Sequence, residues 1–372
     1  QMALDDDPWT PPAEGYYSTD AYTDFAVDRI VENKKLTPNQ PFFLYLAHQA
    51  PHSPLMALPE DIARYRGRYD KGWDVLRAER NARQRELGII DKRHEITPRP
   101  EGIPAWIDVP ETAKASWIGR MEVYAAMIDR VDQGIGRVLA ALEQTGQREN
   151  TLVIFLSDNG ATTEGGPTAG MSGGRGPTAG EEVAPHAPMG SRDSRINELE
   201  PWASVSNTPY RLYKNFLHEG GVKTGLIAVW PRGIHRSGVM SDQVGHVVDL
   251  MPTILQVAGI RYPASRAGVT LRPLRGQSLV PAFEGQTVAR TAPLFWAYGG
   301  HIAVREGDWK LVYNQLGPKP HLELYDLAAD PTEHHDLSAR YPDRAAQLRR
   351  DWLAWADEAG AREAASIRAL SR

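Results

Sequence analysis

The spacing of hydrophobic positions changes several times along the chain, and each change predicts a different element. From Ala115 to Glu143, apolar residues recur every three or four positions, which predicts a long helix. A short polar link follows, and Leu152–Leu156 then forms an unbroken apolar run that predicts a buried strand. A helix joined closely to a strand in this way is typical of an α/β layered fold.

Further apolar runs extend this pattern over the first part of the chain. Two more buried strands and two shorter helices are predicted: Pro41–Leu46 and Leu226–Trp230 as strands, and Ser18–Glu32 and Asp249–Ala258 as helices. Residues 60–110 are charged and mixed, so we expect them to cross the surface and not to enter the core. Residues 160–206 are predicted to be a loop. They contain Gly-Pro-Thr-Ala-Gly twice, at 166–170 and 176–180, but lack the Lys-Ser/Thr and the flanking elements of a phosphate-binding loop.

The pattern changes again near residue 262, where we place a domain boundary. Three short strands and a terminal helix are predicted beyond it: Ile302–Arg305, Trp309–Tyr313, Leu322–Leu327 and Asp343–Ala369. Glu306-Gly307-Asp308 is predicted to make a tight turn between the first two strands, which indicates a small antiparallel sheet. The sequence therefore predicts an α/β part over residues 1–262 and a small α+β subdomain over residues 263–372.

Composition narrows the class of protein. The 372 residues are 41% hydrophobic and 24% charged, as in a soluble globular protein. A net charge of −5 offers no basic surface for nucleic acid or acidic lipid, so neither is an expected partner. No apolar run reaches the ~18 residues of a membrane-spanning helix. The chain has no cysteine, which excludes disulfides and a cysteine nucleophile but does not distinguish a cytoplasmic from a periplasmic location.

Ser157-Asp158-Asn159-Gly160 directly follows the predicted strand Leu152–Leu156. In open α/β sheets ligands bind at the carboxyl ends of strands, so Asp158 and Asn159 are candidate ligands for a cation. Their hard oxygen atoms suit calcium or magnesium better than zinc. The alternative is an Asx turn that closes the strand, with Gly160 at a positive φ.

Two histidines follow the predicted strand Pro41–Leu46. His48 and His52 are four positions apart, a spacing that would place them on one face of a helix and suggest zinc. Pro51 argues against a helix here, so we expect a turn at the end of the strand. His52 is then either a hydrogen-bonded loop residue or a catalytic group.

Lys214 lies among aromatic residues and shortly before Gly220 and Gly221. It is either a solvated lysine whose stem covers apolar surface, or a fixed cation for an anionic substrate. In the second interpretation the two glycines would allow close approach of the backbone.

In their order and spacing, these segments resemble the type I sulfatases, especially bacterial arylsulfatases, of the alkaline phosphatase superfamily. The matching segments, which include Ala-Pro-His at 50–52 and Ser-Asp-Asn-Gly at 157–160, are residues 15–20, 41–55, 124–138, 150–160, 305–312 and 324–337. The resemblance implies an alkaline-phosphatase-like, mostly parallel sheet flanked by helices. It also implies a small carboxyl-terminal antiparallel sheet with a terminal helix, and hydrolysis of organic, especially aryl, sulfate monoesters to an alcohol and sulfate.

The resemblance implies roles for four residues. Asp158 and Asn159 match a pair of calcium ligands in the family, a site for which Mg²⁺ or Mn²⁺ is less expected. His52 matches a histidine that hydrogen-bonds the sulfate ester, and Lys214 matches a lysine that contacts the sulfate near the leaving oxygen. A divalent cation and a lysine would stabilise the charge that gathers on the bridging oxygen as the S–O bond breaks.

The chain departs from the family pattern at the nucleophile. The family uses a formylglycine made from the Cys or Ser of a Cys/Ser-x-Pro-x-Arg motif, and this chain contains neither a cysteine nor Ser-x-Pro-x-Arg. We therefore expect the chain to be the carboxyl-terminal part of a sulfatase that needs an upstream segment carrying the nucleophile, and to be inactive alone. Two alternatives are a phosphonate or phosphodiester hydrolase of the same superfamily, and a non-catalytic binding protein that keeps the scaffold.

Overall fold

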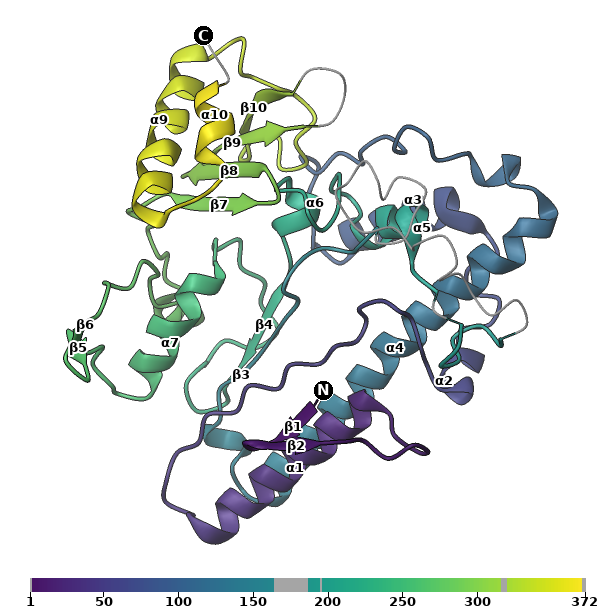
Figure 1. The fold of residues 1–372 in the computed structure, drawn as a ribbon, viewed down its shortest axis with the longest axis vertical. Coiled ribbons are helices and arrows are strands. Elements are labelled where there is room, and N and C mark those ends of the chain that lie inside the picture. Colours follow the sequence, from purple (N-terminus) through teal and green to yellow (C-terminus); the bar gives the residue numbers. More distant parts are fainter. Residues whose placement is uncertain (1, 164–186, 195, 316–319, 370–372) are drawn as a thin grey trace.

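The computed structural model describes residues 2–163, 187–194, 196–315 and 320–369. The repeated Gly-Pro-Thr-Ala-Gly segments at 166–170 and 176–180 lie outside the described residues. Figure 1 shows a helical part around α4 (Glu111–Gln144), a carboxyl-terminal sheet beside α9 (Pro342–Ala359), and a two-stranded ribbon between them. Within the described ranges, none of the helices is both long and apolar enough to cross a bilayer.

The long helix α4 organises the helical part, and α1 runs beside it (Figure 1). α1 (Ser18–Leu36) begins where the sequence predicts and continues four residues beyond the predicted end at Glu32. A close contact lies at Gly134 of α4, where a Cβ would meet Thr23 Oγ1 of α1 at 2.6 Å. The apolar part of the contact is formed by the buried side chains of Ile30, Ala141 and Leu142.

Residues 60–110 contribute a buried core, so the expectation that they only cross the surface is wrong. They include α2 (Pro59–Ala63), α3 (Gly72–Glu86) and the short helix η1 (Trp106–Asp108). Trp73 of α3 packs edge to face, at ring-centroid distances of 4.7 to 5.7 Å, against the indole rings of Trp106, Trp117 and Trp202. Trp202 belongs to α5 (Leu199–Ser206), a helix that also corrects the prediction of a continuous loop over residues 160–206.

The ribbon consists of β3 (Val153–Leu156) and β4 (Leu226–Val229), which pair antiparallel. Every pairing of named strands in the described ranges is antiparallel, so the mostly parallel sheet is not formed among these residues. The predicted strand Pro41–Leu46 is not a strand in the structure. The prediction that these runs are buried is also wrong for the described chain, because the side chains of Phe43, Phe155 and Ile227 are 71%, 47% and 59% exposed.

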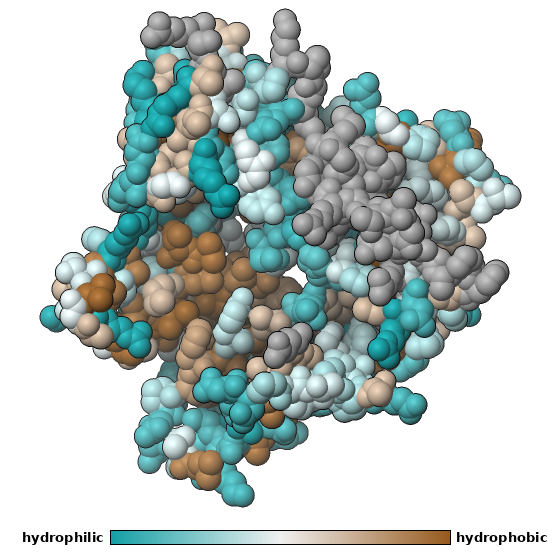
Figure 2. Space-filling view, in the orientation of Figure 1, coloured by the Kyte–Doolittle hydropathy of each residue, from teal (hydrophilic) through white to brown (hydrophobic). Residues whose placement is uncertain are grey.

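Some of the exposed apolar side chains gather in one area of the surface. Figure 2 shows a broad hydrophobic area over the ribbon and α7 (Leu250–Val257). The exposed apolar residues in or beside these elements are Phe155, Leu226, Ile227, Val229, Val247, Val248 and Met251. Both outer edges of the ribbon lack a strand partner in the described part of the chain, which leaves backbone groups and apolar surface open.

The carboxyl-terminal antiparallel sheet is confirmed. Its four strands lie in the order β10 (His321–Asp326), β9 (Trp309–Asn314), β8 (His301–Glu306) and β7 (Leu294–Tyr298), of which β7 was not predicted. The predicted terminal helix is broken in two, because Gly360 takes a left-handed φ of 72° between α9 and α10 (Ala364–Ala369). Both helices pack on the sheet around the fully buried Trp352.

The remaining elements are short. They are β1 (Met2–Leu4), β2 (Asp7–Trp9), η2 (Arg148–Asn150), α6 (Glu219–Val222), η3 (Val247–Asp249), β5 (Ser265–Arg266), β6 (Val269–Thr270) and α8 (Val280–Phe283). The predicted helix Asp249–Ala258 is seen as η3 followed by α7. The predicted domain boundary near residue 262 falls in the link between α7 and β5.

The contact between α1 and α4 makes a prediction about packing. Gly134→Ala should lower the thermal midpoint, because its Cβ meets the buried, β-branched Thr23 and overpacking of this kind costs about 1–3 kcal/mol. Gly136→Ala is the matched control, since Gly136 is exposed on the same helix with nothing within 4 Å of its Cβ position. It should raise the midpoint, because alanine favours helix over glycine. Thermal denaturation measures both; a rise for Gly134→Ala would show that the two helices do not touch there.

Candidate active site

The turn Ser157–Gly160 follows β3 and is held by local hydrogen bonds. Ser157 Oγ donates to Asn159 O at 2.9 Å, and Asn159 Nδ2 donates to Gly160 O at 2.9 Å. Thr224 Oγ1, from the segment before β4, donates to Ser157 O at 2.8 Å. Because the amide nitrogen of Asn159 is used in the turn, its Oδ1 is the atom that can ligate a cation. The carboxylate of Asp158 is exposed beside it.

Gly160 has a different role from the one expected for an Asx turn. Its φ is not positive, so the conformational argument for glycine at this position is wrong. The position needs glycine because a Cβ would lie 1.8 Å from the carbonyl oxygen of Gly220. The backbone of the turn therefore crosses the backbone of α6 in direct contact, and Gly160 N–H donates to Gly221 O at 3.0 Å.

Residues 207–222, called the Lys214 segment below, include Gly220 and Gly221 and make further hydrogen bonds to the chain that follows Gly160. Lys214 N–H donates to Ala161 O at 2.9 Å, and Asn207 Oδ1 accepts from Ala161 N–H at 2.8 Å. Asn207 also donates from Nδ2 to Leu212 O at 2.9 Å, so one side chain joins the turn to the Lys214 segment. Asn207 was not predicted as a site residue, and its role depends on contacts that local sequence does not reveal.

Gly220 and Gly221 serve packing within the Lys214 segment. A Cβ on Gly220 would lie 2.1 Å from Arg211 O, and one on Gly221 would lie 2.0 Å from Phe216 O. Gly220 N–H donates to Arg211 O at 3.1 Å. The two glycines therefore allow the backbone to approach other parts of the Lys214 segment and Gly160.

The structure brings His52 and Lys214 together, although they are 162 positions apart in the sequence. Lys214 Nζ lies 2.9 Å from His52 Nε2. His52 Nδ1 lies 2.8 Å from Ser53 O. Since a carbonyl oxygen only accepts, Nδ1 carries the proton, and Nε2 accepts from the lysine ammonium group. The bond to Ser53 O thus sets the orientation and the tautomer of the His52 ring.

The four predicted site residues share one open cavity. His52, Asp158, Asn159 and Lys214 all line a space of about 4500 Å³. This volume is well above the roughly 300–1,000 Å³ of an ordinary ligand pocket. Its lining extends from Thr10 to Trp355 and includes every residue of β3 and β4, so the shared cavity does not by itself place the four side chains together.

The donors at this site suit a hard cation but are few. Asp158 and Asn159 offer oxygen ligands of the type that Ca²⁺ and Mg²⁺ prefer. In the described ranges, no group of three or more His, Cys, Asp or Glu side chains is arranged to hold a metal. Since Ca²⁺ takes about 6–8 oxygen ligands, these two residues could provide only part of a coordination shell.

The chain matches the family model described as Sulfatase over residues 2–260, which is more than half of its length. The chain belongs to the sulfatase family. A second model, described as N-sulphoglucosamine sulphohydrolase, C-terminal, matches residues 210–351. The residues matched by the sulfatase model include all four predicted site residues. The residues matched by the second model include both Lys214 and the carboxyl-terminal sheet.

Relatives of this sulfatase-family chain are longer than it is. It is 33% identical over 354 residues to an uncharacterised sulfatase of Schizosaccharomyces pombe, covering 93% of the chain and 63% of that protein. It is 35% identical over 286 residues to an arylsulfatase of Klebsiella aerogenes, covering 76% of the chain and 59% of that protein. The chain thus spans about three fifths of the length of these two relatives.

Solved structures share the α/β fold. Ps i-CgsB, solved in complex with k-i-k-neocarrahexaose, matches with a TM-score of 0.58 and 23% identity over 92% of this chain and 56% of that one. The phosphonate monoester hydrolase of Agrobacterium radiobacter matches with a TM-score of 0.50 and 19% identity over 97% of this chain and 62% of that one. At these identities the likeness concerns the fold alone.

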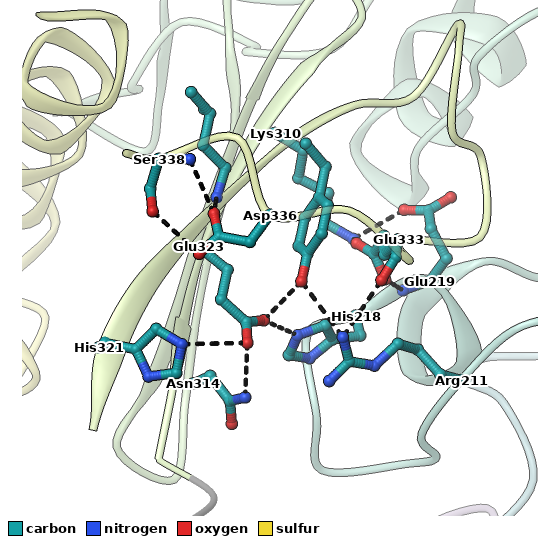
Figure 3. Close-up of polar contacts among 12 residues, drawn as sticks. Arg211, His218, Glu219, Lys310, Asn314, His321, Glu323, Glu333, Asp336 and Ser338 are labelled. Atoms are coloured by element: carbon teal, nitrogen blue, oxygen red, sulfur yellow. Dashed lines mark hydrogen bonds and ion pairs between the residues drawn. The ribbon is translucent and has the colours of Figure 1, made fainter. Parts of the chain in front are cut away.

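A buried ionic cluster connects the Lys214 segment to the carboxyl-terminal sheet of this sulfatase-family chain (Figure 3). Lys310 of β9 is fully buried; its Nζ lies 2.7 Å from Glu219 Oε1 and 2.9 Å from Glu333 Oε1. Glu333 Oε2 also accepts from Glu219 N–H at 2.7 Å. We call these three residues the Lys310 triad. They were not predicted; the available signal was a lysine between apolar residues of a predicted strand.

A second buried group centres on Glu323 of β10 (Figure 3). Its Oε2 accepts from Tyr325 Oη and contacts His218 Nε2, both at 2.8 Å, and its Oε1 accepts from Asn314 Nδ2 at 2.8 Å. Burial acts to raise the pKa of Glu323, but the hydrogen bonds from His218 and Asn314 lower it to about 2. The ionised carboxylate is therefore the form that fits this site.

The lowered pKa of Glu323 makes a prediction about stability and pH. The folded chain binds the Glu323 proton less readily than the unfolded chain, so the stabilisation is present above the ordinary pKa of 4.5 and is lost as the pH falls toward about 2. Urea unfolding at a series of pH values should show a smaller acid-side loss in Glu323→Gln than in the unchanged protein. Glu111→Gln, whose side chain is 86% exposed, is the control and should keep the original pH dependence. If the free energy of unfolding falls equally with pH in Glu323→Gln and in the unchanged protein, the lowered pKa does not belong to Glu323.

Proposed function

We propose that this chain supplies the sulfate-binding and cation-binding residues of a sulfuric ester hydrolase that acts on organic sulfate monoesters, aryl sulfates among them. The observation that carries the proposal is the 2.9 Å contact between Lys214 Nζ and His52 Nε2, at a cavity also lined by Asp158 and Asn159. Sulfatase-family membership supports it. All four residues lie in the proposed α/β part, residues 1–262, and the proposed subdomain over residues 263–372 contacts that part through Lys310 and Glu333.

Lys214 would act on the charge that develops during bond cleavage. As the S–O bond breaks, negative charge gathers on the bridging oxygen, and a lysine ammonium group beside it stabilises the transition state more than the ground state. His52 would hydrogen-bond another ester oxygen. Because sulfate oxygens only accept, this contact needs a proton on Nε2, and it replaces the bond that Nε2 accepts from Lys214 Nζ in the structure. The Nδ1 bond to Ser53 O keeps the ring in place in either state.

Asp158 and Asn159 would hold part of the coordination shell of a divalent cation, Ca²⁺ in preference to Mg²⁺ or Mn²⁺. When bound, such a cation neutralises charge on the sulfate group. The exposed Asp158 carboxylate and the Asn159 Oδ1, which the turn leaves available, support this assignment. The remaining ligands would come from outside the described residues.

We also propose that a segment outside these 372 residues supplies the nucleophile as a formylglycine. The chain has no cysteine and no Ser-x-Pro-x-Arg, so it lacks the residues from which the family makes that group. The open edges of β3 and β4 support the same conclusion, because further strands placed there would complete a larger sheet and cover Phe155 and Ile227.

Lys214→Ala tests the role of the lysine. In the sulfatase that contains this chain, the variant should lower kcat and kcat/KM for an aryl sulfate together, by roughly 10²–10³, because the contact is made in the transition state. Lys71→Ala, which removes a lysine that is 61% exposed, should leave both constants unchanged. A rise in KM with unchanged kcat would show that Lys214 contributes only to binding.

The source of the nucleophile is tested with the chain itself. Purified residues 1–372, assayed with an aryl sulfate and calcium, should show no turnover, and a segment carrying a matured nucleophile should restore it. Multiple turnover by the chain alone would show that another residue present here is the nucleophile. The same assay with an aryl phosphonate ester distinguishes a sulfatase from a phosphonate hydrolase. Faster turnover of the phosphonate ester would favour the phosphonate hydrolase. No turnover of either ester after restoration would indicate a non-catalytic binding protein.

A further inference from the structure

The Lys214 segment is attached to the carboxyl-terminal sheet on both sides of Lys214 (Figure 3). On one side, Arg211 Nη1 donates to Tyr325 Oη at 3.2 Å and to Glu333 O at 3.1 Å. On the other side, Glu219 binds Lys310 through its carboxylate and Glu333 through its backbone N–H. The residues between Arg211 and Glu219 therefore have both ends tied to buried charged or polar groups.

The backbone of this segment is held in an unfavourable conformation. Six non-glycine residues in the described ranges have a left-handed φ, and three of them are Leu212, at 63°, Asn215, at 81°, and Glu333, at 61°. Two of these flank Lys214, and the third belongs to the Lys310 triad. Such conformations persist only where surrounding contacts enforce them. The attachment to the sheet supplies those contacts.

The Lys310 triad is connected to the predicted site residues through the backbone. Lys310 and Glu333 are fully buried and do not line the cavity, whereas Glu219 does. From Glu219 the connection continues to Gly220 and Gly221, whose carbonyl groups meet Gly160. The triad thus reaches both the Lys214 segment and the Ser157–Gly160 turn through hydrogen-bonded backbone.

We propose that Lys310 is a positioning residue, which, through Glu219 and Glu333, holds Lys214 against the Asp158-Asn159 turn in the geometry that sulfate ester hydrolysis needs. This inference rests on the function proposed above. Removing the cation leaves two buried carboxylates facing each other with no counter-charge between them, so the segment must move or take up protons. A shift of Lys214 by even about 1 Å would lower the rate of the chemical step.

Lys310→Met tests the inference, with Tyr325→Phe as a milder second variant that removes the hydroxyl contacted by Arg211. The control is Leu348→Ala, which opens a cavity in the fully buried core beneath α9, away from the Lys214 segment. Hydrogen exchange is measured on the full chain at a temperature where each variant is folded. In Lys310→Met, amides of residues 157–161 and 207–222 should exchange about tenfold faster, with α9 unchanged. Leu348→Ala should show the reverse pattern.

Activity is measured in the sulfatase that contains this chain, with an aryl sulfate. Lys310→Met should lower kcat about tenfold or more with a smaller change in KM, Tyr325→Phe should lower it less, and Leu348→Ala should keep it. Unchanged exchange in residues 207–222, or a loss of kcat equal to that of Leu348→Ala at matched thermal stability, would overturn the inference. If the unchanged protein hydrolyses no sulfate ester, the proposed function is wrong, and the exchange measurement alone decides whether Lys310 positions the segment.

Discussion

The crossing of two backbones at Gly160 and Gly220 is the constraint on which the site depends. A Cβ at Gly160 would lie 1.8 Å from Gly220 O, so the two chains are in contact without any side chain between them. The Gly160 N–H bond to Gly221 O then ties the end of β3 to the segment that carries Lys214. Because catalysis depends on placement to a fraction of an ångström, a direct backbone contact is a more reliable link than one through flexible side chains.

Local periodicity predicts α1 and α4 well and the environment of the strands poorly. The three- and four-residue spacing that predicts a helix over residues 115–143 is a property of one segment, and α4 spans Glu111–Gln144. Whether an apolar strand is buried depends on neighbours elsewhere, which is why Phe155 and Ile227 are exposed despite their composition. The tryptophan core of residues 60–110 was missed for a related reason, since Trp73 and Trp202 meet only after the chain has folded.

The site shows the same division between local pattern and long-range contact. His52 and Lys214 were identified through a family resemblance, and neither residue stands out from its local sequence alone. The Lys310 triad was not identified, because Lys310 and Glu219 are 91 positions apart and a lysine in a strand gives no sign of its partners. Asp-Asn-Gly is common turn chemistry, so the local sequence offers an Asx turn with Gly160 at a positive φ as the alternative to a cation site. The carbonyl group that requires glycine there belongs to Gly220, which no local pattern reveals.

Two kinds of interaction are found in the carboxyl-terminal sheet and at its contact with the Lys214 segment, and they have different effects. Packing around Trp352, which is fully buried, is non-directional and stabilises the sheet and its helices without specifying how a neighbouring loop is oriented. A buried ion cluster adds little net stability, because desolvation offsets most of its attraction, but its hydrogen bonds have fixed directions. Lys310 Nζ contacts Glu219 at 2.7 Å and Glu333 at 2.9 Å, so both carboxylates lie next to the same ammonium group. The hydrophobic core therefore stabilises the carboxyl-terminal sheet and its helices, and the buried ionic contacts are the directional link between that sheet and the Lys214 segment.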